Sequence, residues 1–188
     1  MIIKHITNLA IAMALSQTLS AETNYFEAGK QTLSDLIEIE STESAGLATK
    51  ASEYASEKLR SVGFGEDDLQ IAGPTATTLG LAATLRGAGS GPPVIVMAHL
   101  DVVPAVTESW DTNPYQMVEK DGFLYGRGTS DNKGGAVALI TTFIRLKTEG
   151  FVPDNDIIML LTGDEETEMN SIEYFKDNLE QVKRAAFA

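Results

Sequence analysis

Residues 94–101 of the chain read Val-Ile-Val-Met-Ala-His-Leu-Asp, an unbroken apolar run that leads into charged side chains. Five consecutive apolar residues after Pro92-Pro93 predict a strand that is buried on both faces, which is typical of a parallel sheet. A second predicted strand, from Asp156 to Leu161, leads in the same way into Gly163-Asp164-Glu165-Glu166. Because ligands bind beyond the carboxyl ends of the strands in such sheets, we expect these polar groups to lie together.

Helical segments alternate with these strands. Four stretches have the apolar spacing or composition of helices, namely Tyr25 to Ile39, Leu47 to Leu59, Gly134 to Leu146 and Asn170 to Leu179. The other predicted strands are a half-exposed strand from Leu79 to Leu85, a hairpin that joins residues 116–119 to residues 123–125, and a strand that begins within residues 184–188. This alternation predicts an α/β fold with a mostly parallel sheet flanked by helices.

The N-terminus has the pattern of a secretory signal peptide. Lys4 supplies a positive charge, an apolar stretch runs from Ile6 to Leu15, and small residues follow at Ser20-Ala21. The apolar stretch is too short to cross a bilayer. We therefore expect residues 1–21 to be removed, residues 22–188 to form one domain, and the mature protein to be periplasmic or secreted. The alternative is a buried N-terminal helix.

The composition excludes several classes of function. The 188 residues include no cysteine, which rules out disulfides, thiolate zinc sites and cysteine nucleophiles. With 14 Lys and Arg against 27 Asp and Glu, the formal charge of −13 disfavours nucleic acid and anionic membranes as partners. The two histidines are His5 and His99, and His5 falls in the predicted signal peptide. Histidine chemistry in the mature domain therefore depends on His99.

His99 and Asp101 form the first candidate site. Residues two apart on an extended chain point the same way, so both side chains project together. A metal-bound imidazole commonly donates its other N–H to a carboxylate, and Asp101 is placed to accept it. The alternative is a histidine that is hydrogen-bonded to a neighbouring acid without a metal.

Asp131 lies in the second candidate site, a glycine-rich turn from Gly126 to Gly135. The turn has neither the glycine pattern of a dinucleotide-binding site nor the glycine and lysine pattern of a P-loop. A carboxylate at this place suits a cation, and it can bridge two metal ions. The alternative is that Asp131 caps the following helix.

Asp164, Glu165 and Glu166 form the third candidate site. Adjacent acids at the end of an apolar strand repel one another, and desolvation adds to this cost unless a cation is present. One acid of such a pair can bind a metal while its neighbour acts as a general base. The alternative is a solvated acidic turn.

The three sites occur in one order together with several flanking residues. They comprise His99-Leu100-Asp101-Val102-Val103-Pro104, Trp110, Pro114-Tyr115, Gly126-Arg127-Gly128, Asp131-Asn132-Lys133-Gly134-Gly135 and Asp164-Glu165-Glu166. This constellation, dense from Val94 to Glu166, resembles the di-zinc metallopeptidase family of glutamate carboxypeptidase, acetylornithine deacetylase, succinyl-diaminopimelate desuccinylase and aminoacylase.

The resemblance implies a zinc-dependent hydrolase of amide bonds, with two Zn²⁺ ions and a peptide or an N-acyl amino acid as its substrate. Because an exported enzyme of this family is expected to scavenge peptides, we expect the carboxypeptidase or dipeptidase type. The resemblance gives His99, Asp131 and Glu166 as metal ligands, with Asp131 between the two ions. It gives Glu165 as the general base and Asp101 as the acid that steadies His99. It also implies a cis peptide bond between Asp131 and Asn132. Residues 167–170 depart from the small residues and glycines of many relatives, which leaves the shape of this loop open.

The ligand set is incomplete, because each zinc ion needs about four ligands. In the family, a further acid follows a strand that would start near Ala186, and a histidine lies close to the C-terminus. A lid domain, often used for dimerisation, is also part of the family pattern. We therefore expect residues 22–188 to be the N-terminal part of a catalytic domain that is inactive alone and binds zinc weakly.

Other readings remain open. One is a scaffold without activity. Another is an exported acidic protein that binds calcium through Asp131, Asp164, Glu165 and Glu166, although a histidine in the same cleft favours zinc. A serine hydrolase that uses His99 is disfavoured, because the sequence has no GxSxG motif.

Overall fold

The computed structural model describes residues 25–185, and its centre is a four-stranded sheet. The strands lie in the order β1 (Leu69–Ala72), β2 (Gly80–Leu85), β6 (Ile157–Thr162) and β3 (Val94–His99). β3 pairs with β6 in parallel, whereas β2 is antiparallel to both β1 and β6. The α/β class is confirmed, but the sheet is mixed and not mostly parallel. β1 and β2 are antiparallel because residues 73–79 return the chain alongside β1.

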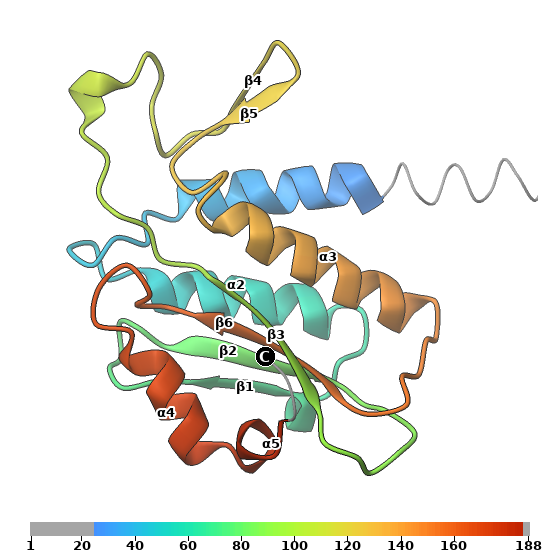
Figure 1. Ribbon diagram of the computed structural model, residues 1–188. Helices are drawn as coiled ribbons and strands as arrows, with labels where there is room; N and C mark the ends of the chain where they lie inside the picture. Colours follow the sequence, from blue (N-terminus) through green and yellow to red (C-terminus); the bar gives the residue numbers. More distant parts are fainter. Residues whose placement is uncertain (1–24, 186–188) are drawn as a thin grey trace, which may run out of the picture.

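Helices cover both faces of the sheet (Figure 1). One face carries the N-terminal helix, which is described over residues 25–38, together with α2 (Ala48–Arg60) and α3 (Lys133–Thr148). The other face carries α4 (Asn170–Asn178) and α5 (Glu180–Lys183). A hairpin of β4 (Val118–Lys120) and β5 (Phe123–Tyr125) extends from the same side as the N-terminal helix, and two single 3₁₀ turns lie at Glu66–Asp68 and Thr107–Ser109.

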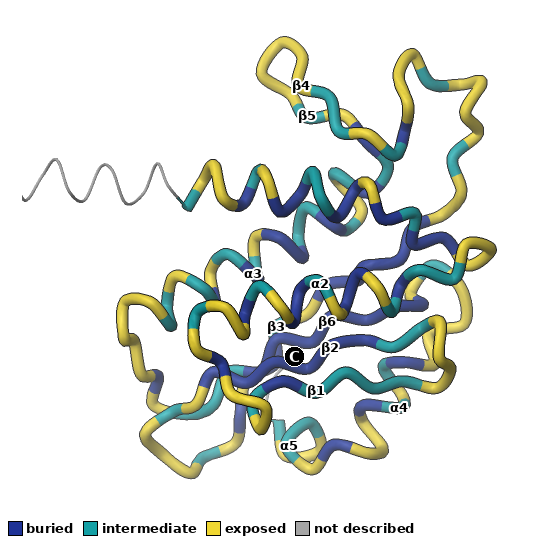
Figure 2. Tube along the Cα trace, turned by 180° about the vertical axis from the view of Figure 1, so that it is seen from behind, coloured by how far each residue is buried: buried dark blue, intermediate teal, exposed yellow. Residues whose placement is uncertain are grey.

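The core divides into two clusters because side chains alternate across β2 and β6. Leu81 and Leu161 face α2, α3 and the N-terminal helix, whereas Ala82 and Ile158 face Phe175 of α4. All six residues of β2 are therefore buried, and the expected half-exposed strand is wrong. Figure 2 shows the continuous buried layer along the inner strands.

β3, in contrast to β2, is less buried than the sequence predicts. It lies at the edge of the described sheet, and its Val94 and Met97 side chains are 39% and 41% exposed. Only its last part, Ala98 and His99, is buried throughout. The expectation that this strand is covered on both faces is therefore wrong for its first half, because an edge position leaves part of it uncovered.

The predicted helices and the hairpin are confirmed, with ends that lie within two residues of the expected ones. β1 and α5 have no counterpart in the sequence prediction, and Arg184 ends α5 where a strand was expected to begin. The predicted signal peptide and residues 186–188 lie outside the described residues. Within residues 25–185, no helix is long and apolar enough to cross a membrane.

The second core cluster makes a stability prediction. Phe175 is fully buried against the sheet, whereas Phe123 in the hairpin is 67% exposed. Phe175→Ala should lower the free energy of unfolding by about 3–5 kcal/mol, because it leaves a cavity, and Phe123→Ala should change it by less than about 0.5 kcal/mol. Urea denaturation followed by circular dichroism measures both values. A loss below about 1 kcal/mol for Phe175→Ala would contradict this packing of α4.

Candidate functional site

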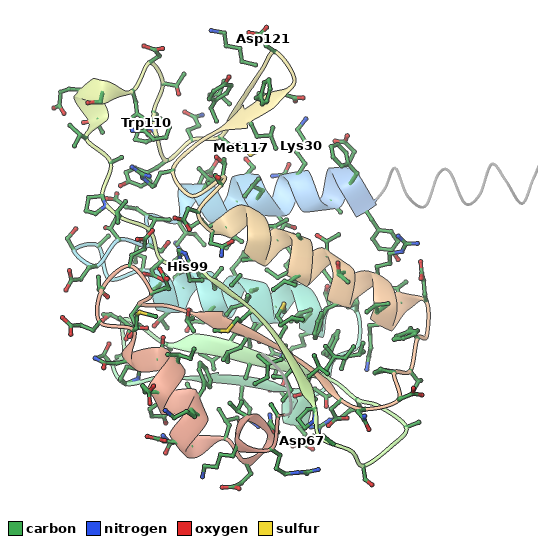
Figure 3. All side chains as sticks on the ribbon, in the orientation of Figure 1. Lys30, Asp67, His99, Trp110, Met117 and Asp121 are labelled. Carbon is green, nitrogen blue, oxygen red and sulfur yellow. The ribbon has the colours of Figure 1, made fainter. Side chains whose placement is uncertain are left out.

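The three predicted site segments meet at one edge of the sheet. His99 is the last residue of β3 and pairs in parallel register with Thr162, the last residue of β6. The acidic loop that follows Thr162 and the strand end that carries His99 therefore begin side by side. Asp131 joins them from the turn before α3, and Figure 3 shows His99 at this end of the sheet, below the N-terminal helix.

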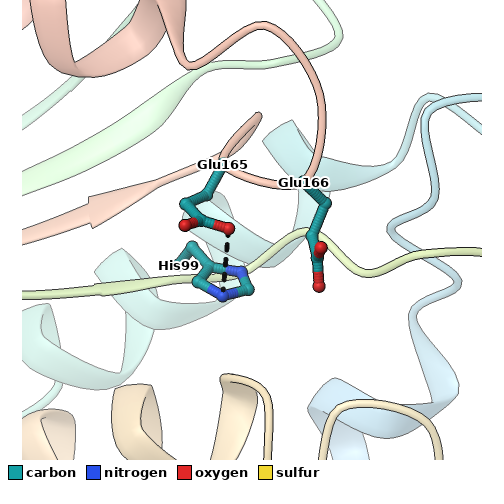
Figure 4. Close-up of side chains that lie close together, drawn as sticks. All are labelled: His99, Glu165 and Glu166. Atoms are coloured by element: carbon teal, nitrogen blue, oxygen red, sulfur yellow. Dashed lines mark ion pairs between the residues drawn. The ribbon is translucent and has the colours of Figure 1, made fainter.

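His99 is the centre of the cluster. Its Nε2 atom lies 3.0 Å from Oδ1 of Asp131 and 3.6 Å from Oε2 of Glu165. Ligand atoms of His99, Glu165 and Glu166 all lie within 4.8 Å of one another. Figure 4 shows the Glu165 carboxylate above the imidazole ring and the Glu166 side chain, from the same loop, beside it. The predicted convergence is thus present, and Glu165, predicted as a base, lies on the same side of the imidazole as the predicted ligand Asp131 but 0.6 Å farther from Nε2.

Asp101 holds the other side of the imidazole ring. Nδ1 of His99 lies 3.0 Å from the Asp101 carbonyl oxygen and 3.5 Å from its carboxylate Oδ1. Burial alone would lower the pKa of His99, but the hydrogen bonds and charge of Asp101 and the contact with Asp131 raise this pKa to about 9. With Nδ1 engaged by Asp101, Nε2 is the nitrogen that faces the remaining acids.

Asp101 also connects the strand end to the acidic loop. Its carboxylate Oδ2 accepts a hydrogen bond of 2.8 Å from the backbone N–H of Glu166. Burial would raise the pKa of Asp101, but the interaction with His99 and the backbone N–H groups of Glu166 and Glu165 lower it below the usual value. Asp101 is therefore a buried anion that orients both the histidine and the loop.

Asp131 does not cap α3. The N-cap position of the helix is Asn132, and no side chain makes a capping hydrogen bond there. The Asp131 side chain is 77% exposed and makes its contact with His99 instead. The peptide bond between Asp131 and Asn132 is cis, as the family resemblance implied.

The electrostatics and donor set of the cluster fit a divalent cation. Burial, together with the nearby carboxylates of Asp131, Asp101 and Glu165, raises the pKa of Glu166, and only His99 opposes this effect. A cation would relieve the repulsion among these acids. One imidazole nitrogen and several carboxylate oxygens form a mixed set of the kind that zinc accepts and calcium uses less often.

Asp164 stands apart from the cluster. It is buried, and its carboxylate accepts hydrogen bonds from the Ser171 backbone N–H at 3.0 and 3.1 Å and from the Ser171 hydroxyl. Its carbonyl accepts from the N–H groups of Thr167 and Met169. Asp164 therefore closes the loop that carries Glu165 and Glu166, and its placement among calcium ligands is not supported.

Lys133 and Ser41 also lie close to the site, although the sequence patterns indicate a role for neither of them. Lys133 is fully buried at the start of α3. Burial lowers its pKa to about 7, although the charges of Asp101 and Glu40 oppose the shift. The sequence does contain one indication of the burial of Lys133, because this lysine stands at the start of an apolar helix beside glycines, where a solvated lysine is not expected.

Comparison with known proteins places the site within a matched region. Residues 95–187 match the model of "Peptidase family M20/M25/M40". This part of the chain belongs to that family. The match begins in β3 and includes all five predicted site residues, so the resemblance drawn from the motifs is confirmed.

Curated relatives in the M20/M25/M40 family carry two kinds of name. A probable succinyl-diaminopimelate desuccinylase of Staphylococcus aureus is 42% identical over 91 residues, which are 47% of this chain and 23% of the relative. The N-fatty-acyl-amino acid synthase/hydrolase PM20D1 of Bos taurus is 40% identical over 84 residues, 44% of this chain and 17% of the relative. These matches thus span less than a quarter of either relative.

Solved structures support the fold of the family. Human carnosine dipeptidase 1 superposes with a TM-score of 0.69 at 23% identity, over 86% of this chain and 37% of that chain. The dipeptidase Dug1p of Saccharomyces cerevisiae superposes with a TM-score of 0.67 at 24% identity, over 84% of this chain and 36% of that chain. At this level of identity the superpositions show a shared fold.

The loop closure by Asp164 can be tested directly. Asp164→Ala leaves the buried N–H and hydroxyl of Ser171 without their acceptor, and it should lower the free energy of unfolding by about 1–3 kcal/mol. The amide hydrogen of Ser171 should then exchange faster. Asp177→Ala, at an exposed acid on α4, is the control and should have little effect. Equal effects of the two substitutions would show that Asp164 does not hold the loop.

Proposed function

We propose that this chain forms part of a zinc-dependent hydrolase that cleaves amide bonds in peptides or N-acyl amino acids, of the carboxypeptidase or dipeptidase type. The single observation that carries the proposal is the imidazole of His99 among Asp131, Glu165 and Glu166 at the joined ends of β3 and β6. The names of the curated relatives, a desuccinylase and an acyl-amino acid hydrolase, support the same bond type.

Each residue has a distinct role in the proposed site. His99, Asp131 and Glu166 would hold zinc, and Asp131 would be shared by two ions. Asp101 keeps Nδ1 of His99 engaged, so that Nε2 presents its lone pair to the ion once its proton has left. The hydrogen bond from Glu166 N–H to Asp101 keeps Glu166 beside the same imidazole.

Glu165 is the proposed general base. Its side chain is 45% exposed, and its Oε2 atom lies on the Nε2 side of His99, so it has access to solvent and to the cation site. Bound zinc supplies Lewis acidity, which lowers the pKa of water and polarises an amide carbonyl. Glu165 would accept the proton from the attacking water and return it to the leaving amine.

The proposed function extends to the complete enzyme, because the described residues offer one imidazole and a few carboxylates for two ions. Each zinc ion needs about four ligands. We propose that further ligands and the substrate-selective surface come from sequence that the family has and this chain does not include.

We also propose that residues 1–21 direct export. Mass spectrometry of the mature protein shows whether cleavage occurs after Ala21.

The role of Glu165 is tested by Glu165→Gln in the longest natural product that carries this sequence. The substitution keeps the size of the side chain and removes its basicity. Zinc content should stay unchanged, and turnover of an N-acyl amino acid or dipeptide should fall by about 10²–10⁴-fold. Glu168→Gln, an exposed acid in the same loop, is the control. Near-normal turnover with zinc retained would overturn this assignment.

Metal titrations separate zinc from calcium. In protein treated with a chelator, His99→Ala should weaken zinc binding at least about tenfold and leave calcium binding unchanged, because calcium takes oxygen ligands. Isothermal titration calorimetry measures both, with Glu173→Gln on α4 as an exposed control. For the 188-residue chain we expect zinc affinity weaker than micromolar. Tighter binding of calcium than of zinc would favour the calcium alternative, and two zinc ions bound at micromolar affinity would refute an incomplete site.

A further inference from the structure

Lys133 is a buried lysine that the proposed chemistry does not use. It is the first residue of α3, and its Nζ atom donates hydrogen bonds to the carbonyl oxygens of Leu36 at 2.8 Å and Ile39 at 2.7 Å. The N-terminal helix ends at this point, where the last carbonyls lack partners within the helix. Lys133 therefore ties the turn that follows Asp131 to the end of the N-terminal helix.

Gly128 leaves room for the stem of this lysine. A Cβ atom at Gly128 would lie 3.1 Å from Cδ of Lys133 and 2.9 Å from Cγ1 of Val102, and its φ of +92° lies in the region that favours glycine. The lysine stem and Val102 thus approach the same glycine. Because Val102 follows Asp101, the lysine also packs close to the strand end that carries the histidine.

Ser41 continues the connection to that strand end. Its N–H donates to the Ile39 carbonyl at 2.8 Å, the same oxygen that Lys133 uses. Its hydroxyl donates to the Leu100 carbonyl at 2.6 Å, and its own carbonyl accepts from the Val102 N–H at 3.1 Å. Ser41 is fully buried, so these bonds are shielded from water. They hold the residues on both sides of Asp101.

We propose that Lys133 and Ser41 are positioning residues, which form a clamp between the Asp131 turn and the His99–Asp101 strand end. The clamp runs from Lys133 through the Ile39 carbonyl to Ser41, and from Ser41 to Leu100 and Val102. Its consequence for cation binding rests on the proposed function, whereas its mechanical effect rests on the hydrogen bonds alone. A neutral amine has two N–H donors, so both protonation states of Lys133 can serve both carbonyls.

Two substitutions break the clamp at different points. Lys133→Met keeps an unbranched, apolar stem and removes the terminal donor group, and Ser41→Ala removes the hydroxyl that binds Leu100. The matched control is Ser52→Ala, because Ser52 is also fully buried and its hydroxyl also donates to a carbonyl, that of Leu79, at 2.8 Å. Ser52 lies in α2 and shares no hydrogen-bond partner with the clamp, and its replacement removes the same kind of bond.

Amide hydrogen exchange of the 188-residue chain measures the mechanical effect without any metal. The Val102 amide should exchange at least about tenfold faster in Lys133→Met and about threefold faster in Ser41→Ala, while the amides that pair β2 with β6 keep their rates. Ser52→Ala should leave the Val102 rate unchanged. A uniform acceleration of all amides, or an unchanged Val102 rate in both clamp variants, would overturn the clamp. If Lys133→Met does not fold, the comparison of Ser41→Ala with Ser52→Ala decides.

A cobalt(II) titration of the longest natural product that carries this sequence, followed by visible absorption, measures the consequence for the site. Binding should weaken at least about tenfold in Lys133→Met and threefold in Ser41→Ala, and stay within twofold of the parent in Ser52→Ala. Equal cobalt affinity in all four proteins, despite faster Val102 exchange, would refute a positioning role. A parent protein of that length that binds no cobalt at millimolar concentration would instead contradict the proposed function, and the exchange rates would still decide whether the clamp exists.

Discussion

The parallel register of β3 and β6 is the constraint on which the site depends. It sets His99 opposite Thr162, so that both strands leave the sheet at the same level. A shift by one residue would turn the His99 side chain to the opposite face and move it away from the acidic loop. The register is fixed by the core, because Ala98 and Leu161 belong to the cluster under α3 while Ile95 and Ile158 belong to the cluster under α4. Apolar packing on two faces thus determines where the polar chemistry lies.

Two buried carboxylates then convert this register into a defined geometry. The backbone carbonyl oxygen and the Oδ1 atom of Asp101 face Nδ1 of His99, while its Oδ2 atom accepts a hydrogen bond from the Glu166 N–H. Asp164 uses its carboxylate on Ser171 and so closes the loop between β6 and α4. The cost of burying these anions is offset by the Glu166 N–H and the His99 ring at Asp101, and by the N–H and hydroxyl of Ser171 at Asp164. Asp164 faces away from the cluster, whereas the charge of Asp101 adds to the repulsion that Asp131 and Glu165 exert on Glu166.

The sequence was sufficient for the elements with long apolar runs and for the site residues that follow them. β6, α2 and α3 could be predicted because their length and periodicity are local properties. The direction of β2 and the edge position of β3 could not, since strand pairing joins residues far apart in sequence. The burial of β2 on both faces could not be predicted either, because Gly80 has no side chain and Ala82 has a small one, so neither indicates a core position in the sequence. Lys133 and Ser41 escaped notice because their partners are backbone carbonyls 97, 94 and 59 residues away, and backbone groups leave no trace in a sequence pattern.

The two halves of the site differ in how closely the surrounding protein holds them. His99 and Asp101 are 5% and 4% exposed and are held by bonds on several sides, whereas the side chains of Asp131 and Glu165 are 77% and 45% exposed. Side chains with few buried contacts reorient at little free-energy cost, and those within a packed hydrogen-bonded frame do not. A cation that entered the cluster would therefore find one fixed nitrogen and several adjustable oxygens. Such a division suits an ion that must accept changing ligands during a reaction, because the imidazole keeps its position while the carboxylates adapt.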